Sequence, residues 1–378
     1  MMDMMQFTSR PTMETIRNYP TIMDIVEYLA HVEEQQMRCN SPLGVLPTWM
    51  YRMRQPGIFT LVVNEETKMP VLVPGARRQM VFYRGQSGEH IPCVPSVWRG
   101  GRESWKRNEL LSRLQTAEMI LVMQTHPVVQ FMAQTPIKYT NSFGQTTNVI
   151  VPIQYDALAQ HYGIQTRYLD LTVDKWVAAF FASTDQQNGQ YKVHYSGEDF
   201  DSQYGVFYIL DRSESGVETM TQMGIFPVGM QYFNRPGRQS AYAMCMHSDV
   251  AFEQINGVIP IYFRHDKVAN ETVFAMSQQA MCYFPEDSFA GVVNRIVNRA
   301  DQSFAKDSVR LVQRIYYPDL GDDEVLKIVK DSNIDVVDDL STSFAPEELD
   351  RDLKEWEREG KDRYLQHVNF MDIAPFPI

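Results

Sequence analysis

Apolar side chains recur at every third or fourth position in four stretches of the chain, which is the spacing of one face of a helix. The helices predicted from this spacing cover most of residues 11–39, 109–123, 155–163 and 172–184. Gly163 can end the third helix, because glycine readily takes the left-handed backbone conformation that closes a helix. Thr172 is a suitable cap for the start of the fourth helix.

Short apolar runs bounded by turn residues predict strands at residues 59–63, 80–83, 205–210 and 258–263. Pro260 places the last of these at a sheet edge, since proline has no backbone N–H to offer a second neighbour. Residues 137–148 have the composition of turns and predict an exposed loop. Strands and helices alternate without a regular βαβ rhythm. The predicted fold class is therefore α+β, with a central mixed or antiparallel sheet and flanking helices.

The character of the sequence changes near residue 300, where charged residues become dense and apolar positions become sparse. This composition predicts a largely helical, charged and solvated C-terminal region without a core of its own. The predicted organisation is an N-terminal helical segment (1–58), a central domain (59–295) and the charged, mainly helical C-terminal region (296–378).

Composition and charge narrow the range of partners. The chain has 378 residues, of which 44% are hydrophobic, so it can bury a large core. Its formal net charge of −12 argues against general binding to nucleic acids or to anionic membranes. No stretch approaches the roughly 18 apolar residues of a membrane span, and we expect a cytoplasmic protein. The four cysteines stand too far apart for a CxxC knuckle, and no motif indicates a bound metal.

Several motifs resemble the FRG domain, a bacterial and phage-associated family named for the triplet Phe-Arg-Gly. They are "VFYRGQS" at 81–87, "PSVWRG" at 95–100, "LAQHYGIQTRYLDLTVDKWVAAFFAST" at 158–184 and "YFPEDSFAG" at 283–291. The chain departs from the family pattern at Tyr83, which replaces the phenylalanine, at Leu171, which replaces a tryptophan, and at Ala241, which replaces a glycine.

The family's order of functional residues is similar to that of ADP-ribosyltransferases: an arginine on an early strand, a threonine-bearing central segment and a late polar residue. The resemblance therefore implies NAD as the ligand, with ADP-ribosyl transfer or NAD hydrolysis as the reaction. It gives Gln239 the place of the late polar residue that meets a ribose hydroxyl. A glutamine has no negative charge to stabilise an oxocarbenium-like transition state. Glu253 and Glu286, near late strands, are acidic residues that could supply that charge instead.

Arg84 follows two aromatic residues at the end of a predicted strand. A guanidinium presents a rigid fork of donors that matches phosphate oxygens, and Gly85 would let a ligand approach the backbone closely. The resemblance assigns Arg84 to the diphosphate or ribose of NAD. The alternative is a structural ion pair between Arg84 and a buried carboxylate such as Asp170.

The segment "QHYGIQTRYLD" concentrates polar groups between apolar flanks, namely Gln160, His161, Thr166, Arg167 and Asp170. We expect Gln160 and His161 to point into a cleft and Thr166 to help orient the ribose or base. A histidine titrates near neutral pH, so His161 is a candidate general base or a donor to a ligand carbonyl. Its alternative role is to cap backbone carbonyls. Arg167 either pairs with Asp170 or forms a second prong of an anion clamp beside Arg84.

Two functions from different classes fit these residues. The first is binding of an anionic nucleotide-like ligand, specifically NAD, with His161 and Gln239 as catalytic residues. The second is a non-catalytic binding or sensing module, in which the acidic C-terminal helices dock a protein partner. A third arrangement, in which Arg84, Arg167 and Asp170 form a closed ionic network without a cavity, would support neither catalysis nor ligand binding.

Overall fold

The computed structural model describes residues 4–39, 59–63, 70–74, 81–99, 102–134, 137–140, 146–149, 153–187, 189–212, 223–228, 231–299, 301–340, 342–365 and 368–372. Predictions that concern Met80, residues 40–58 or the turn at 141–145 lie outside the described residues. None of the described helices is both long enough and apolar enough to cross a membrane.

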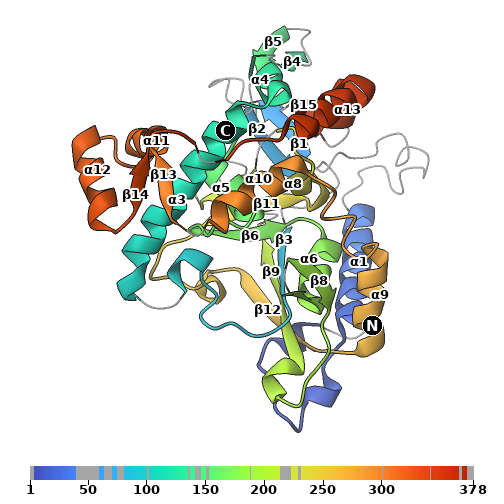
Figure 1. Cartoon of the computed structure of the whole chain (residues 1–378). Coiled ribbons are helices and arrows are strands. Elements are labelled where there is room, and N and C mark those ends of the chain that lie inside the picture. Colours follow the sequence, from blue (N-terminus) through green and yellow to red (C-terminus); the bar gives the residue numbers. More distant parts are fainter. Residues whose placement is uncertain are drawn as a thin grey trace, which may run out of the picture.

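A six-stranded sheet in the order β10-β11-β6-β3-β9-β12 forms the centre of the molecule (Figure 1). Its neighbouring strands run antiparallel. This confirms the predicted α+β class with a central antiparallel sheet. β12 lies at one edge, as Pro260 predicted. The strands are β3 (Val81–Gln86), β6 (Tyr168–Thr172), β9 (Tyr204–Asp211), β10 (Ile225–Pro227), β11 (Ala241–Cys245) and β12 (Val258–Arg264).

Side chains on the central strands alternate between two apolar layers, as the strand period of two requires. On β9, Tyr208 belongs to one buried cluster and Phe207 to the other. The Phe207 side is covered by α1 (Ile22–Cys39), α6 (Lys175–Ser183) and α9 (Lys267–Met276), which pack on one another. The Tyr208 side is covered by short 3-10 turns, η3 (Ser96–Trp98) and η5 (Phe252–Gln254).

A third buried cluster joins β6 and β11 to three helices, α3 (Arg102–Gln124), α5 (Tyr155–His161) and α10 (Ser288–Val297). Short elements complete this part of the chain: η1 (Met4–Phe7), η2 (Ile16–Asn18), η4 (Phe200–Ser202), α4 (Pro127–Gln134) and α8 (Arg235–Arg238). The helix predicted within residues 11–39 is thus two segments, η2 and α1, separated at Pro20.

Of the two helix ends predicted from the sequence, one is confirmed and one needs correction. Gly163 follows α5 with φ +93°, the left-handed conformation predicted for it. The cap of α6 is Asp174 and not Thr172, because the Asp174 carboxylate accepts the Trp176 backbone N–H at 2.9 Å. Thr172 is instead the last residue of β6, and its hydroxyl donates to the Gln239 carbonyl at 2.7 Å. Asp174 begins the helix because a carboxylate accepts more strongly than a hydroxyl there.

The prediction of a loop across residues 137–148 was wrong for its described parts. β4 (Ile137–Thr140) and β5 (Thr146–Val149) pair antiparallel. Their isoleucine, tyrosine, valine and threonine residues favour strands, and this preference outweighs the overall turn composition. Other small sheets of the described residues include β7 (Thr184–Gln187) with β8 (Gln190–Val193), and β1 (Phe59–Val63), β2 (Pro70–Pro74) and β15 (Val368–Asp372) in the order β15-β1-β2.

The C-terminal region is largely helical, as predicted, but the prediction that it has no core was wrong. Val325 and Val329 lie one helical turn apart and pack in a buried cluster with Leu114 of α3. These buried residues form a narrow apolar stripe on their helix, so they hardly change the composition of the segment. A prediction from charge density therefore missed them. The Glu118–Arg299 ion pair also joins α3 to this region.

The elements of the C-terminal region are β13 (Ser303–Ala305), α11 (Lys306–Tyr316), α12 (Asp322–Asp331), β14 (Asp335–Val337) and α13 (Pro346–Leu365). The domain boundary at 295/296 stays a prediction.

Candidate functional site

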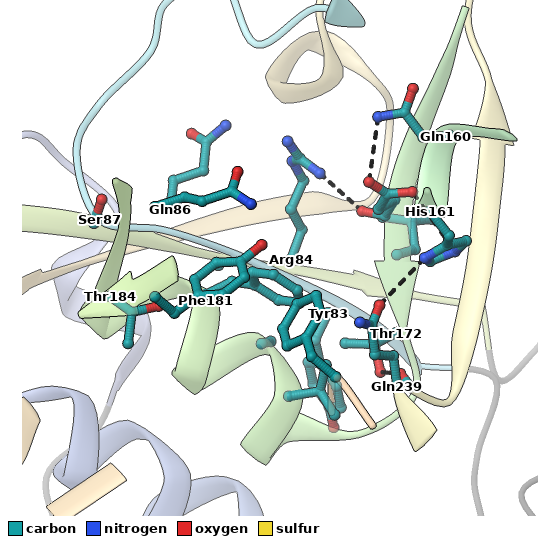
Figure 2. Close-up of a pocket in the computed structure, with 18 of the residues that line it drawn as sticks. Tyr83, Arg84, Gln86, Ser87, Gln160, His161, Thr172, Phe181, Thr184 and Gln239 are labelled. Atoms are coloured by element: carbon teal, nitrogen blue, oxygen red, sulfur yellow. Dashed lines mark hydrogen bonds and ion pairs between the residues drawn. The ribbon is translucent and has the colours of Figure 1, made fainter. Parts of the chain in front are cut away.

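A cavity of about 500 Å³ lies where β3 and β6 part, and Figure 2 shows most of its lining. The ladder between these two strands consists of one residue pair, Tyr83 with Thr172. Beyond this pair, the side chain of Arg84 spans the gap and donates from Nη1 to the Asp170 carbonyl at 2.9 Å. In a longer ladder, a backbone N–H of β3 would donate to this carbonyl. Here the guanidinium of Arg84 donates to it instead.

Arg84 lies inside β3, opposite Tyr208 of β9, and not at the end of a strand. Its Nε is buried and has no hydrogen-bond partner. Within the described residues no carboxylate forms an ion pair with Arg84, so its contact with Asp170 is to the backbone and not to the side chain. The structural ion pair weighed as an alternative role is therefore not what holds Arg84.

A second guanidinium and a histidine lie beside Arg84 in the cavity wall, on Arg99 and His90. Arg99 donates from Nε to the Val94 carbonyl at 3.3 Å. Burial and, to a lesser extent, repulsion from Arg84 lower the pKa of Arg99. Burial and repulsion from Arg99 and Arg84 likewise lower the pKa of His90. These groups destabilise one another's positive charge, and an anion bound between them would relieve the repulsion.

A third guanidinium, that of Arg235, comes from α8. Its central carbon lies 4.9 Å from the ring centre of Tyr162 and 4.8 Å from that of Phe284. Nη1 donates to the His161 carbonyl at 3.1 Å, and the buried Nε has no partner. Stacking on two rings stabilises the cation while leaving part of its donor set unused.

The three cavity arginines differ in their partners from seven other arginines of the described chain. Arg84, Arg99 and Arg235 each contact a backbone carbonyl and form no ion pair with a described carboxylate. Ion pairs to carboxylates are instead made by Arg10, Arg113, Arg264, Arg295, Arg299, Arg310 and Arg351. In a chain of net charge −12, three such arginines therefore lie on one cavity.

Gln160 and His161 line the cavity, as expected from the sequence. Gln160 donates from Nε2 to Oδ2 of Asp170 at 3.3 Å. His161 is buried between Gln239, whose Oε1 lies 3.2 Å from Nδ1, and Asp170, whose Oδ1 lies 3.6 Å from Nε2. Burial lowers the pKa of His161, against the attraction of Asp170. The imidazole is therefore held in its neutral form next to a carboxylate.

Thr166 and Arg167, which were predicted to contact the ligand, are not among the residues that line this cavity. Thr166 is buried, and its hydroxyl donates to Oε1 of Gln160 at 2.9 Å. Arg167 is exposed, and the acidic groups that act on it electrostatically include Asp156 and Glu109.

Gly85 borders the cavity, and its missing side chain leaves room for a close contact with α6. A Cβ atom at Gly85 would lie 1.9 Å from the Ala178 carbonyl oxygen and 2.8 Å from the Ala182 Cβ. β3 and α6 touch there, so the glycine is needed for strand–helix packing.

Aromatic rings form the wall near Arg235. Phe181, Tyr191 and Phe284 all line the cavity and are partly exposed. The rings of Tyr191 and Phe284 stack with centroids 4.5 Å apart, and Phe181 meets both edge-on. Burial raises the pKa of Tyr191 to about 12, so its hydroxyl stays protonated at neutral pH. A planar, partly apolar ligand group would find matching surface here.

Two histidine rings, those of His194 and His265, lie close to the cavity wall with their centroids 4.0 Å apart. Asp185 of the cavity wall accepts from the Ser87 hydroxyl at 2.8 Å and lies 2.8 Å from Nδ1 of His194. Nε2 of His265 lies 2.7 Å from the Ser87 carbonyl. Burial and, to a lesser extent, His194 lower the pKa of His265 to about 4.

This depressed pKa predicts a loss of stability in mild acid. The unfolded chain binds a proton at His265 near pH 6.5, whereas the folded chain binds it near pH 4. The contribution of His265 is therefore complete above pH 6.5, is lost as the pH falls to 4, and amounts to at most about 3 kcal/mol. Urea unfolding at both pH values should show a smaller pH dependence for His265→Asn than for the wild type. Equal pH dependence in both proteins would contradict this account.

Arg99 and Arg235 are not among the ligand-binding residues predicted from the sequence. Both residues stand in segments that could have drawn attention to them, Arg99 in the motif "PSVWRG" and Arg235 in the basic segment "NRPGRQ". What the sequence could not show is that they reach the same cavity as Arg84. Within the described residues no group of three or more His, Cys, Asp or Glu side chains is arranged to hold a metal.

A comparison with protein-family models matches residues 79–190 to the FRG domain. This range includes β3, α5, β6 and α6, and with them Arg84, His161 and Asp170 of the cavity. The motif "YFPEDSFAG" and residue Gln239 lie outside the matched range. Comparisons with the curated proteins and with the solved structures gave no significant match. The chain therefore contains an FRG domain, as its motifs predicted.

Proposed function

We propose that the cavity binds an anionic, nucleotide-like ligand, with NAD as the specific candidate. The observation that carries this proposal is the set of cavity arginines, Arg84, Arg99 and Arg235, that are held by backbone carbonyls and not by carboxylates. Phosphate oxygens would supply the missing negative charge, and they match the fork of guanidinium donors. A diphosphate fits best beside Arg84 and Arg99, where the positive charges repel one another.

The rest of the cavity suits the uncharged parts of such a ligand. Its volume of about 500 Å³ falls within the usual range for small-molecule sites. Phe181, Tyr191 and Phe284 offer ring faces and edges on which a base or nicotinamide ring can pack. Polar side chains also line the cavity, and Figure 2 shows Gln160 on one side of Arg84 and Ser87 and Thr184 on the other.

The proposed reaction is cleavage of the glycosidic bond to nicotinamide, with transfer of ADP-ribose to an acceptor hydroxyl or to water. Such a transition state carries positive charge, which a carboxylate stabilises. Glu253 and Glu286 do not line the cavity, since Glu253 accepts from the Cys93 N–H and Glu286 pairs with Arg351. Asp170, next to His161, is the carboxylate better placed for this role.

Titration with NAD, ADP-ribose and adenosine tests the proposal. We expect the phosphate-containing ligands to raise the melting temperature and adenosine to have little effect, because the arginines recognise the diphosphate. A ligand at 100 times its Kd stabilises a folded protein by about 2.7 kcal/mol, which is easily detected. Release of nicotinamide, followed by chromatography, reports the reaction. An unchanged melting temperature with millimolar NAD and ADP-ribose would contradict the proposal.

Binding without nicotinamide release would instead favour the second function, a non-catalytic module that senses a nucleotide. In that case the C-terminal helices α11 and α12, which share a buried apolar cluster with α3, would be the first place to look for a protein partner.

A further inference from the structure

A chain of hydrogen bonds fixes where His161 carries its proton. The Gln239 side-chain amide donates from Nε2 to the Tyr283 carbonyl at 3.1 Å, which fixes the orientation of the amide. Its oxygen, Oε1, therefore faces Nδ1 of His161 at 3.2 Å. An amide oxygen only accepts, so the proton of a neutral His161 ring must be on Nδ1. Nε2 of the ring is left with a lone pair.

That lone pair faces another acceptor. Nε2 of His161 lies 3.6 Å from Oδ1 of Asp170, and both atoms are buried without any hydrogen-bond partner. The other carboxylate oxygen, Oδ2, accepts from Nε2 of Gln160. Gln160 is itself oriented, because its Oε1 accepts from the backbone N–H and the hydroxyl of Thr166. The side-chain amides of Gln160 and Gln239 thus hold two acceptors, Nε2 of His161 and Oδ1 of Asp170, facing each other.

This arrangement lacks one proton. Buried polar atoms without partners are costly, and one proton between Nε2 and Oδ1 would satisfy both atoms. At neutral pH burial keeps the ring uncharged, and the nearby Arg235 cation adds to this effect, while Asp170 and Gln239 oppose it. The Asp170 side chain is 37% exposed and that of His161 only 4%, so a reactant in the cavity meets the carboxylate first.

We propose that His161 and Asp170 together form the proton acceptor of the site, and that Gln239 is a positioning residue that sets the ring tautomer. This inference rests on the proposed function for the identity of the reactant, an acceptor hydroxyl or water. The O–H bond of that hydroxyl breaks, and the proton is received at the Asp170 carboxylate and held between Oδ1 and Nε2. The oxygen forms a bond to the anomeric carbon. Nicotinamide leaves with the electron pair of the glycosidic bond and is neutral.

The tautomer can be measured without any ligand, by long-range ¹H–¹⁵N NMR of the histidine rings in the full chain at neutral pH. We expect His161 to be neutral, with the proton on Nδ1. In Gln239→Leu the acceptor for Nδ1–H is lost, so the proton is expected to move to Nε2 and donate to Asp170. Asp170→Asn should keep the proton on Nδ1, because the new amide can donate to Nε2.

His126 provides an internal reference in the same spectra. Its Nε2 lies 3.2 Å from Oδ2 of Asp352 and its Nδ1 has no partner, so its proton is expected on Nε2 in every variant. A wild-type His161 that is doubly protonated, or that carries its proton on Nε2, would overturn the proposal. This result does not depend on NAD binding, and it is therefore distinguishable from failure of the proposed function.

The kinetic consequence is tested with Asp170→Asn, whose side chain is exposed enough to be replaced without emptying the core. We expect nicotinamide release to fall about 100-fold or more in kcat, with NAD affinity changed only a few-fold. Unchanged kcat in Asp170→Asn would overturn the proton-acceptor role. If the wild type releases no nicotinamide, the proposed function fails, and the tautomer measurement alone decides the assignment of His161 and Gln239.

Discussion

Arg84→Ala is expected to weaken binding of NAD and ADP-ribose by about 10- to 100-fold while the protein remains folded. The guanidinium would donate charge-assisted hydrogen bonds to the diphosphate, and each such bond contributes about 1.5 to 3 kcal/mol. Its loss also removes the bond to the Asp170 carbonyl, which lowers the free energy of unfolding by about 1 kcal/mol. Calorimetric titration gives the affinity, and urea unfolding gives the stability.

Arg238→Ala is a matched control, because Arg238 lies on the same short helix as Arg235 but is exposed and outside the cavity. It should bind as the wild type does, although it changes the net charge by the same amount. Arg84→Lys keeps the charge but loses the fork, so it should bind with intermediate affinity. Equal losses in Arg84→Ala and Arg238→Ala would mean that general charge, and not a specific clamp, governs binding. Unfolding of Arg84→Ala would assign Arg84 to the fold.

Gly85→Ala is expected to destabilise the protein by about 3 kcal/mol or more. The new methyl group would lie 1.9 Å from the Ala178 carbonyl oxygen, which belongs to the backbone of α6 and cannot turn away. Strand β3 and helix α6 would have to separate, and with them the cavity wall that carries Arg84. Urea unfolding and the yield of soluble protein measure the effect.

Gly88→Ala is the control for this change, because no atom lies within 4 Å of a Cβ built at Gly88. Its free energy of unfolding should stay within about 0.5 kcal/mol of the wild-type value. Similar stability in both variants would show that the close contact between β3 and α6 is relaxed in solution. It would also return Gly85 to its predicted role, in which the missing side chain admits a ligand.

The cavity contains some of the residues that the sequence predicted for a ligand site and lacks others. The difference has one physical reason. Gln160, His161, Arg84 and Gln239 do meet around one cavity, because their motifs stand next to strand and helix ends that the sequence also indicates. Thr166 and Arg167 stand in the same motif but lie outside the cavity. Neighbouring residues in a motif share a place along the chain, whereas the direction of each side chain depends on the sheet to which the segment belongs.

The sequence by itself determined the local features of this protein. Apolar spacing and short apolar runs determined α1, most of α3, α5, α6, β1, β3, β9 and β12, Pro260 determined the edge strand, Gly163 determined the end of α5, and the motifs determined the FRG domain. These features depend on residues close together in the chain. Turn composition and charge density misled at 137–148 and after residue 300, because averages over a segment hide a strand pair or a narrow apolar stripe.

Only the tertiary structure decided which arginines form no ion pair with a described carboxylate. Arg84, Arg99 and Arg235 are far apart in sequence, and nothing local shows that each would find a backbone carbonyl and not a carboxylate. The same holds for the facing acceptors of His161 and Asp170, whose tautomer depends on Gln239 and on the Tyr283 carbonyl. Electrostatic and hydrogen-bond partners are chosen by distance in space, and these distances depend on the fold and not on the local sequence.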